Sequence, residues 1–149
     1  MIYKGLILEE NIILLTAENI NNSALNNVAL TSELRGVLLR SYGTHQVAPV
    51  KLNYNTDKGF KRLDAFLILA DKVDLNQLKT LASEFKQDSL ILSDNNRLTT
   101  KINLIDDNSE NIGKLVSETK EIALKQDFYI EQRFFGNDFF YILVDNNVS

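Results

Sequence analysis

Asp64-Ala-Phe-Leu-Ile-Leu-Ala70 is too short for a helix core and too apolar for a loop, so it predicts a buried strand. Asp74 then offers a side-chain oxygen to the free amides of a new helix, and Gln77 completes a capping-box pattern. Ser89-Leu-Ile-Leu-Ser93 predicts a second strand. Between the two strands, helical spacing predicts one apolar helix face, formed by Leu75, Leu78, Ala82 and Phe85. This stretch is therefore expected to form a strand, a helix and a strand.

The N-terminal third of the chain repeats this order. Asn11-Ile-Ile-Leu-Leu-Thr16 predicts a buried strand. Gln46 to Tyr54 predicts another, in which Pro49 favours an edge position or a bulge because proline cannot donate to a ladder. The helix expected between them stops at Gly43, a residue suited to a left-handed cap. Its apolar stripe consists of Leu30, Leu34, Val37, Leu38 and Tyr42.

Two such units in sequence predict an α+β fold, a ferredoxin-like sandwich with helices on one face of a mostly antiparallel sheet. Met1 to Leu8 and Arg97 to Leu104 are expected to add edge strands. In Asp106 to Lys125, a cap at Ser109 and four apolar residues at helical spacing predict a further helix, the four being Ile112, Leu115, Val116 and Ile122. With 149 residues and 44% hydrophobic content, one domain over residues 1–149 is expected, because two cores would be hard to fill.

The composition narrows the chemistry that a site can use. The chain has no cysteine, which removes disulfides, thiol nucleophiles and thiolate metal sites. Its one histidine, His45, leaves no conventional zinc set, and no cofactor is expected. The formal net charge is -4 and the basic residues are scattered, which disfavours binding to DNA or RNA. No run reaches membrane-spanning length and the first residues lack a signal-peptide layout, so a cytoplasmic protein is expected.

Several polar residues near the ends of the predicted strands are candidates for a site, although each also has an ordinary explanation. Tyr54 is more often an amphipathic strand-end residue, and Asp64 is more often a solvated residue that opens a strand. Thr16 and Ser89 are of common types at strand ends, and Gln87-Asp88 is an ordinary helix exit. Their order along the chain, rather than any one of them, carries the functional prediction.

That order resembles a known family. Thr16-Ala17-Glu18-Asn19 precedes a predicted helix that carries Leu34-Arg35, and Tyr54 precedes an acid that opens a strand at Asp64. The segment from Leu81 through Gln87-Asp88-Ser89 then leads into a strand. In this arrangement the chain resembles the small phage S-adenosylmethionine lyases, formerly called S-adenosylmethionine hydrolases.

The resemblance covers roughly residues 12–144 and includes a terminal hairpin, expected from Asp127 to Arg133, a Gly136-Asn137 turn and Phe139 to Val144. Two departures from the family pattern stand out. The family has a glutamate where this chain has Asp64, and it usually has a glycine shortly before the tyrosine, where Leu52-Asn53 stand here. These differences imply a pocket that differs in detail.

The resemblance implies that the substrate's own methionine carboxylate attacks its γ-carbon, releasing 5′-methylthioadenosine and homoserine lactone. It implies that Asp64 binds the α-ammonium group and that Tyr54 packs beside the sulfonium. The nucleoside would be held around Thr16, Ala17, Gln87, Asp88 and Ser89. The family's assembly implies a homotrimer with sites between subunits.

Two substrates fit this chemistry: S-adenosylmethionine itself, and its conjugate with AMP, the signal of some type III CRISPR antiviral systems, beside which relatives of these lyases occur. The chain could come from a phage or a bacterium. Two other classes stay open. A sensor would bind an adenosyl nucleotide without cleaving it, and a phage inhibitor would dock on a host enzyme.

Overall fold

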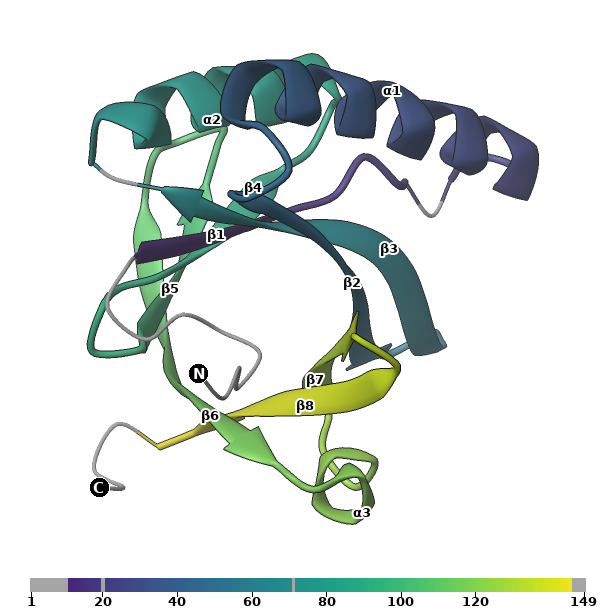
Figure 1. Ribbon diagram of the computed structural model, residues 1–149, viewed down its shortest axis with the longest axis vertical. Helices are drawn as coiled ribbons and strands as arrows, with labels where there is room; N and C mark the ends of the chain where they lie inside the picture. Colours follow the sequence, from purple (N-terminus) through teal and green to yellow (C-terminus); the bar gives the residue numbers. More distant parts are fainter. Residues whose placement is uncertain (1–10, 20, 71, 146–149) are drawn as a thin grey trace.

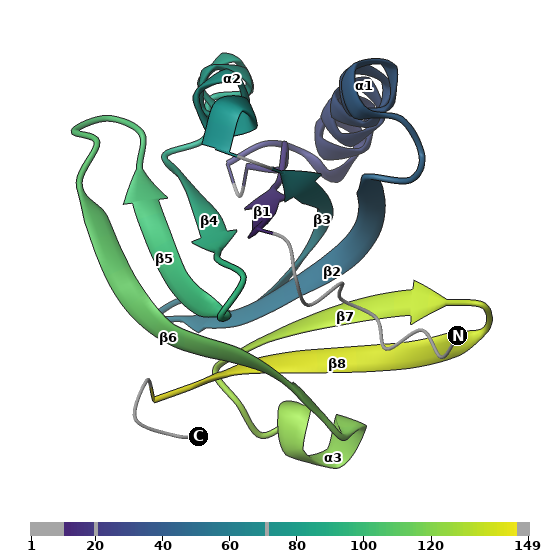
Figure 2. The same ribbon diagram turned by 60° about the vertical axis from the view of Figure 1, so that its left-hand side comes forward.

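The computed structural model describes residues 11–19, 21–70 and 72–145. Within these residues, eight strands close into one antiparallel barrel in the order β1-β3-β2-β7-β8-β6-β5-β4 (Figures 1 and 2). The strands are β1 Asn11–Leu15, β2 Val47–Thr56, β3 Gly59–Ala70, β4 Ser89–Ser93, β5 Leu98–Asn103, β6 Ser109–Glu118, β7 Phe128–Phe134 and β8 Asn137–Val144. The helices are α1 Ala24–Tyr42, α2 Lys72–Glu84 and α3 Lys120–Ala123.

The expected ferredoxin-like α+β sandwich is therefore wrong. The first half of the chain does form strands with two helices, α1 and α2, on one side (Figure 1). The sheet does not stay open, however, because the β7–β8 hairpin joins β2 at one margin while β6 pairs with both β8 and β5. This non-local pairing turns a two-layer sandwich into a closed barrel.

The segment from Asp106 to Lys125 is the clearest local error. It was expected to be helical after a cap at Ser109, but β6 occupies half of it and only the four-residue α3 follows, capped by Thr119. Leu115 packs in the barrel interior, whereas its neighbour Val116 packs against the outer cluster beneath α3. A strand places adjacent side chains on opposite faces, so Leu115 is buried and Val116 partly buried without a helix.

The strands β1 and β3 bury apolar side chains on both faces. Ile12 and Leu14 point into the barrel, where Leu67 also lies. Ile13 and Ile68 point outward into a second core that the helices cover. Strands covered on both faces carry continuous apolar runs rather than alternation, and this is why both strands could be recognised in the sequence.

The two long helices bury the apolar faces that the sequence predicts. The helix α1 begins after Ser23, whose side chain accepts from the amide of Asn26, and ends at Gly43 with φ of 78°. In α2, Leu78 and Ala82 are fully buried as predicted. The predicted cap is shifted, because α2 begins at Lys72 and places Asp74 in its first turn. No described helix is long and apolar enough to cross a membrane.

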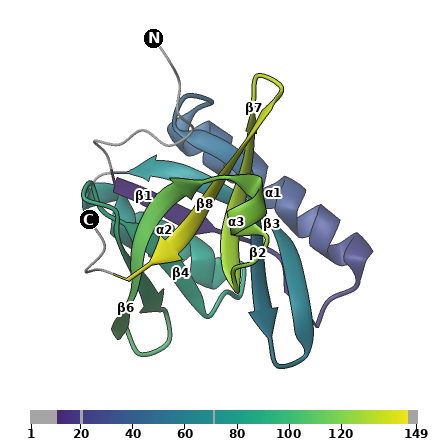
Figure 3. The same cartoon turned by 90° about the horizontal axis from the view of Figure 1, so that it is seen from below.

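The remaining strand predictions hold with small shifts. The predicted strand Arg97 to Leu104 corresponds to β5, and the predicted terminal hairpin corresponds to β7 and β8. The edge position or bulge predicted for Pro49 is not found, because β2 has neighbours on both sides, but Pro49 lies outside the part of β2 that pairs with β7. Met1 to Leu8 lies outside the described residues. On the side away from α1 and α2, the short α3 packs beside β8 (Figure 3).

The closure of the barrel requires a glycine in β6. Gly113 has φ of 125°, and a Cβ atom there would lie 2.5 Å from the carbonyl oxygen of Val144 in β8. It follows a bulge, because Gly113 pairs with Thr99 and Asn111 with Thr100, which leaves Ile112 as one extra residue.

We expect Gly113→Ala to lower the free energy of unfolding by about 2 to 4 kcal/mol, because backbone strain and the contact with the Val144 carbonyl add together. Gly59→Ala is the matched control, since Gly59 has φ of 111° but open space around a Cβ, and it should lose only about 1 kcal/mol. Urea unfolding measures both. Equal losses would mean that close approach of β6 and β8 does not constrain the barrel.

Candidate functional site

A pocket of about 470 Å³ occupies one open end of the barrel. Its walls are apolar side chains from the barrel interior, and its rim is polar and comes from the chain after β1 and from the turn between α2 and β4. The wall includes Leu14, Leu52, Leu63, Ile91, the bulged Ile112 and Phe128. Barrel mouths are common positions for small-molecule sites, and this combination of apolar wall and few polar groups is typical of them.

Five of the seven predicted site residues line this pocket. They are Thr16, Tyr54, Gln87, Asp88 and Ser89. They come from three segments that are far apart in the sequence, and the barrel brings them to one end. Ala17 does not line the pocket, because its side chain is fully buried in the core beneath the helices. Asp64 does not line it either.

Besides Asp88, the pocket contains a second acid, Glu18, which was not among the predicted site residues. Its backbone amide donates to Thr16 Oγ1 at 3.1 Å, and its carbonyl oxygen accepts from Gln87 Nε2 at 3.2 Å. Thr16 Oγ1 donates to the carbonyl oxygen of Asp64 at 2.7 Å. The backbone amide of Asp64 donates to the Glu18 carboxylate. Three of the predicted residues therefore fix the position of Glu18.

The pKa of the Glu18 carboxyl group is changed by its burial and by several neighbouring groups. Burial raises the pKa of Glu18 above 4.5, and the nearby Asp64 charge adds to this, whereas the amide of Asp64 and the Lys51 ammonium act in the opposite direction. The pKa of Tyr54 is also raised, first by burial and then by the charge of Glu18. A cation bound between these two side chains would favour the ionised carboxylate, so this part of the pocket suits a positively charged group.

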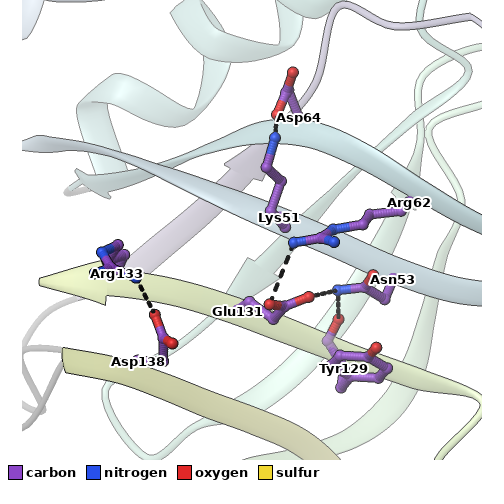
Figure 4. Close-up of polar contacts among 8 residues, drawn as sticks. All are labelled: Lys51, Asn53, Arg62, Asp64, Tyr129, Glu131, Arg133 and Asp138. Carbon is purple, nitrogen blue, oxygen red and sulfur yellow. Dashed lines mark hydrogen bonds and ion pairs between the residues drawn. The ribbon is translucent and has the colours of Figure 1, made fainter. Parts of the chain in front are cut away.

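Asp64 belongs to a different surface. Its carboxylate lies on the outside of the barrel and forms an ion pair with Lys51 (Figure 4). A second hollow of about 400 Å³ lies there, lined also by Arg62, Glu131 and Arg133. The alternation of side chains along β3 explains why Asp64 lies away from the pocket. Asp64 shares the outer face of β3 with Phe66 and Ile68. Leu63 and Ala65 face inward. Only the backbone of Asp64 reaches Glu18.

The outer hollow is lined by paired charges. Arg62 lies 3.4 Å from Glu131, and Arg133 lies 3.5 Å from Asp138 (Figure 4). Beneath them, the fully buried Asn53 donates to Glu131 at 3.0 Å. These exposed pairs contribute little to stability individually, and their mutual neutralisation makes this hollow a weaker candidate site than the pocket.

No metal site is found in the part of the chain that the structure describes, where no three histidine or acidic side chains lie close enough to hold an ion. His45 is exposed in the turn between α1 and β2 and does not line the pocket. The candidate site therefore consists of two carboxylates, hydroxyl and amide groups, and two lysines around an apolar wall.

Comparison with known proteins does not identify a family for this chain. No protein-family model matches the chain, and no curated protein matches it. The functional argument therefore depends on the pocket and on the residues that line it.

Glu18→Gln should raise the thermal midpoint at pH 7. Because the folded-state pKa of Glu18 is raised, the stability linked to its protonation is present below pH 4.5 and lost as pH rises through the folded value. Glutamine removes this loss while it can still accept from the amide of Asp64. The difference from the unsubstituted protein should thus be largest near pH 7 and shrink towards pH 4.

Calorimetry at several pH values tests this expectation, with Glu33→Gln at an exposed position of α1 as the matched control. A lower thermal midpoint for Glu18→Gln at pH 7 would show that the ionised Glu18 carboxylate stabilises the fold instead of destabilising it.

Proposed function

We propose that this protein is a lyase that cleaves S-adenosylmethionine, or its conjugate with AMP, to methylthioadenosine or the adenylated form and homoserine lactone. One observation carries the proposal: Thr16, Tyr54, Gln87, Asp88 and Ser89, selected by their order in the sequence, line a single pocket. No comparison tests the resemblance, so the proposal depends on this local arrangement and on the fit of the substrate.

The pocket has the features that an adenosyl sulfonium requires. Its volume of about 470 Å³ falls within the roughly 300 to 1,000 Å³ of small-molecule sites. The apolar wall can bury the adenine ring and the methylthio group. The Glu18 carboxylate and the Tyr54 ring and hydroxyl can receive the two positive charges of the substrate, the α-ammonium and the sulfonium.

The reaction needs no metal, base or external nucleophile. An oxygen of the substrate's methionine carboxylate attacks the γ-carbon, a carbon–oxygen bond forms, and the carbon–sulfur bond breaks. The sulfur keeps the electron pair and becomes a neutral thioether, while the carboxylate closes the lactone. The protein contributes by folding the methionine chain into the reactive geometry and excluding water, which are the contributions open to this set of side chains.

The structure changes the residue that we assign to the α-ammonium. The resemblance implied Asp64, but its carboxylate lies outside the barrel and pairs with Lys51. Glu18 lines the pocket and accepts from the backbone amide of Asp64. We assign ammonium binding to Glu18 and a positioning role to Asp64. A homotrimer with sites between subunits stays a prediction from the resemblance.

A sensor that binds an adenosyl nucleotide without cleaving it is the second candidate, because the same pocket would serve it. Incubation of the purified protein with each of the two substrates, followed by chromatography for methylthioadenosine or its adenylated form, separates the two functions. Product formation supports the lyase. A thermal shift without product supports the sensor, and no response to either compound favours a protein that docks on a partner.

Substitution of Glu18 and of Asp64 should lower the activity by unequal factors. Glu18→Gln is expected to lower kcat/KM by roughly 30- to 150-fold, because a charge-assisted contact is worth about 2 to 3 kcal/mol. Asp64→Asn keeps the backbone amide that donates to Glu18 and should lose less than about tenfold. Steady-state kinetics on folded variants measures both. The reverse order would restore the assignment of the ammonium to Asp64.

Isotope labelling tests the intramolecular step. In oxygen-18 water, we expect unlabelled homoserine lactone first, and then homoserine labelled in its carboxylate, because hydroxide opens the lactone at the carbonyl. Water attacking the γ-carbon would instead label the hydroxyl of homoserine. Mass spectrometry of the product fragments distinguishes the two, and a labelled hydroxyl would require a general base near the sulfonium.

A further inference from the structure

Two lysines on the rim of the pocket form no ion pair with any residue that the structure describes. Lys86 follows α2 and Lys101 lies in β5, and both line the pocket and are exposed. In the described residues, the four ion pairs use other cations: Lys51, Arg62, Lys79 and Arg133. Within the described part of the chain, no carboxylate therefore competes in an ion pair with a ligand for these two ammonium groups.

Lys86 also has a backbone conformation that is unusual for a lysine. Lys86 has φ of 58°, a left-handed conformation, and the amide of Gln87 donates to the carbonyl oxygen of Ala82 at 3.0 Å. This is the position after a helix that glycine usually occupies, because a side chain is disfavoured there. A lysine at this position adds strain to the helix end, and strain of this kind collects at functional sites.

Lys101 approaches the pocket from β5. It pairs with Ile91 of β4, and partners in an antiparallel ladder share one face of the sheet. Ile91 packs against the barrel interior and lines the pocket. The Lys101 side chain is thus directed to the mouth of the barrel, where Lys86 also lies.

We propose that Lys86 and Lys101 form a phosphate subsite, so that the pocket binds phosphorylated adenosyl compounds in preference to unphosphorylated ones. The rim then has carboxylates, Glu18 and Asp88, and ammonium groups, which matches a ligand that carries both a sulfonium and a phosphate. This inference builds on the proposed function and selects the AMP conjugate as its substrate. Two lysine ammonium groups bind a phosphate through charge-assisted hydrogen bonds.

Binding of AMP and of adenosine tests the subsite without any reaction. Titration calorimetry should show that the full-length protein binds AMP about tenfold more tightly than adenosine. Lys86→Gln/Lys101→Gln should abolish this preference. Lys120→Gln, at an exposed position of α3 outside the pocket, is the control for a change in charge and should keep it. Equal binding of AMP and adenosine, or a preference that survives the double substitution, would overturn the subsite.

A third variant separates the role of Lys86 in binding from a role in folding. Lys86→Gly relieves the left-handed strain, so its thermal midpoint should equal or exceed that of the unsubstituted protein while its preference for AMP falls. An unchanged preference in Lys86→Gly would remove this residue from the subsite.

Turnover gives an independent readout. The ratio of kcat/KM for the AMP conjugate to that for S-adenosylmethionine should fall about tenfold in Lys86→Gln/Lys101→Gln and stay constant in Lys120→Gln. A constant ratio in the double variant counts against the subsite. If the unsubstituted protein cleaves neither compound, the proposed lyase is wrong, and the comparison of AMP with adenosine still decides whether the subsite exists.

Discussion

The burial of β1 and β3 on both faces is the constraint on which the rest of the structure depends. These strands form a wall shared by two cores, with Ile12 and Leu14 on the barrel side and Ile13 on the helix side. Because the wall must be covered twice, the chain needs helices over one face and a closed set of strands over the other. The segment that leaves β1 at the barrel mouth carries Thr16 and Glu18, so the same wall determines where the site can lie.

Local patterns predicted the elements well where burial was strong. The apolar runs of β1, β3 and β4 and the stripes of α1 and α2 follow directly from side-chain periodicity. The barrel could not be predicted in this way, because its closure depends on pairing between β2 and β7 and between β6 and β8, which no short window of sequence contains. Leu115 and Val116 illustrate the difficulty, since neighbouring apolar residues fit a helix stripe as well as a strand buried on both faces.

The site shows a similar division. The order of Thr16, Tyr54 and Gln87 in the chain located the pocket, since all three line it. That Asp64 lies outside this pocket could not be predicted, because the direction of its side chain depends on its place in β3 and on which face closes into a barrel. Glu18 stands in the stretch Thr16-Ala17-Glu18-Asn19, but its position in the pocket is fixed by hydrogen bonds from the amide of Asp64 and the side chain of Gln87. Neither contact is local in sequence.

The closed ladder also restricts how copies of this chain can associate. Every described strand already has a hydrogen-bonded neighbour on each side, whereas an open sheet would present unpaired amides and carbonyls that can recruit another chain. Only short stretches such as the start of β2 lack a neighbour on one side, so association within the described region is expected to rely on side chains more than on strand addition. Affinity and specificity would then depend on the shape and charge of the outer surface, which substitutions can change one residue at a time without altering the backbone pairing inside a subunit.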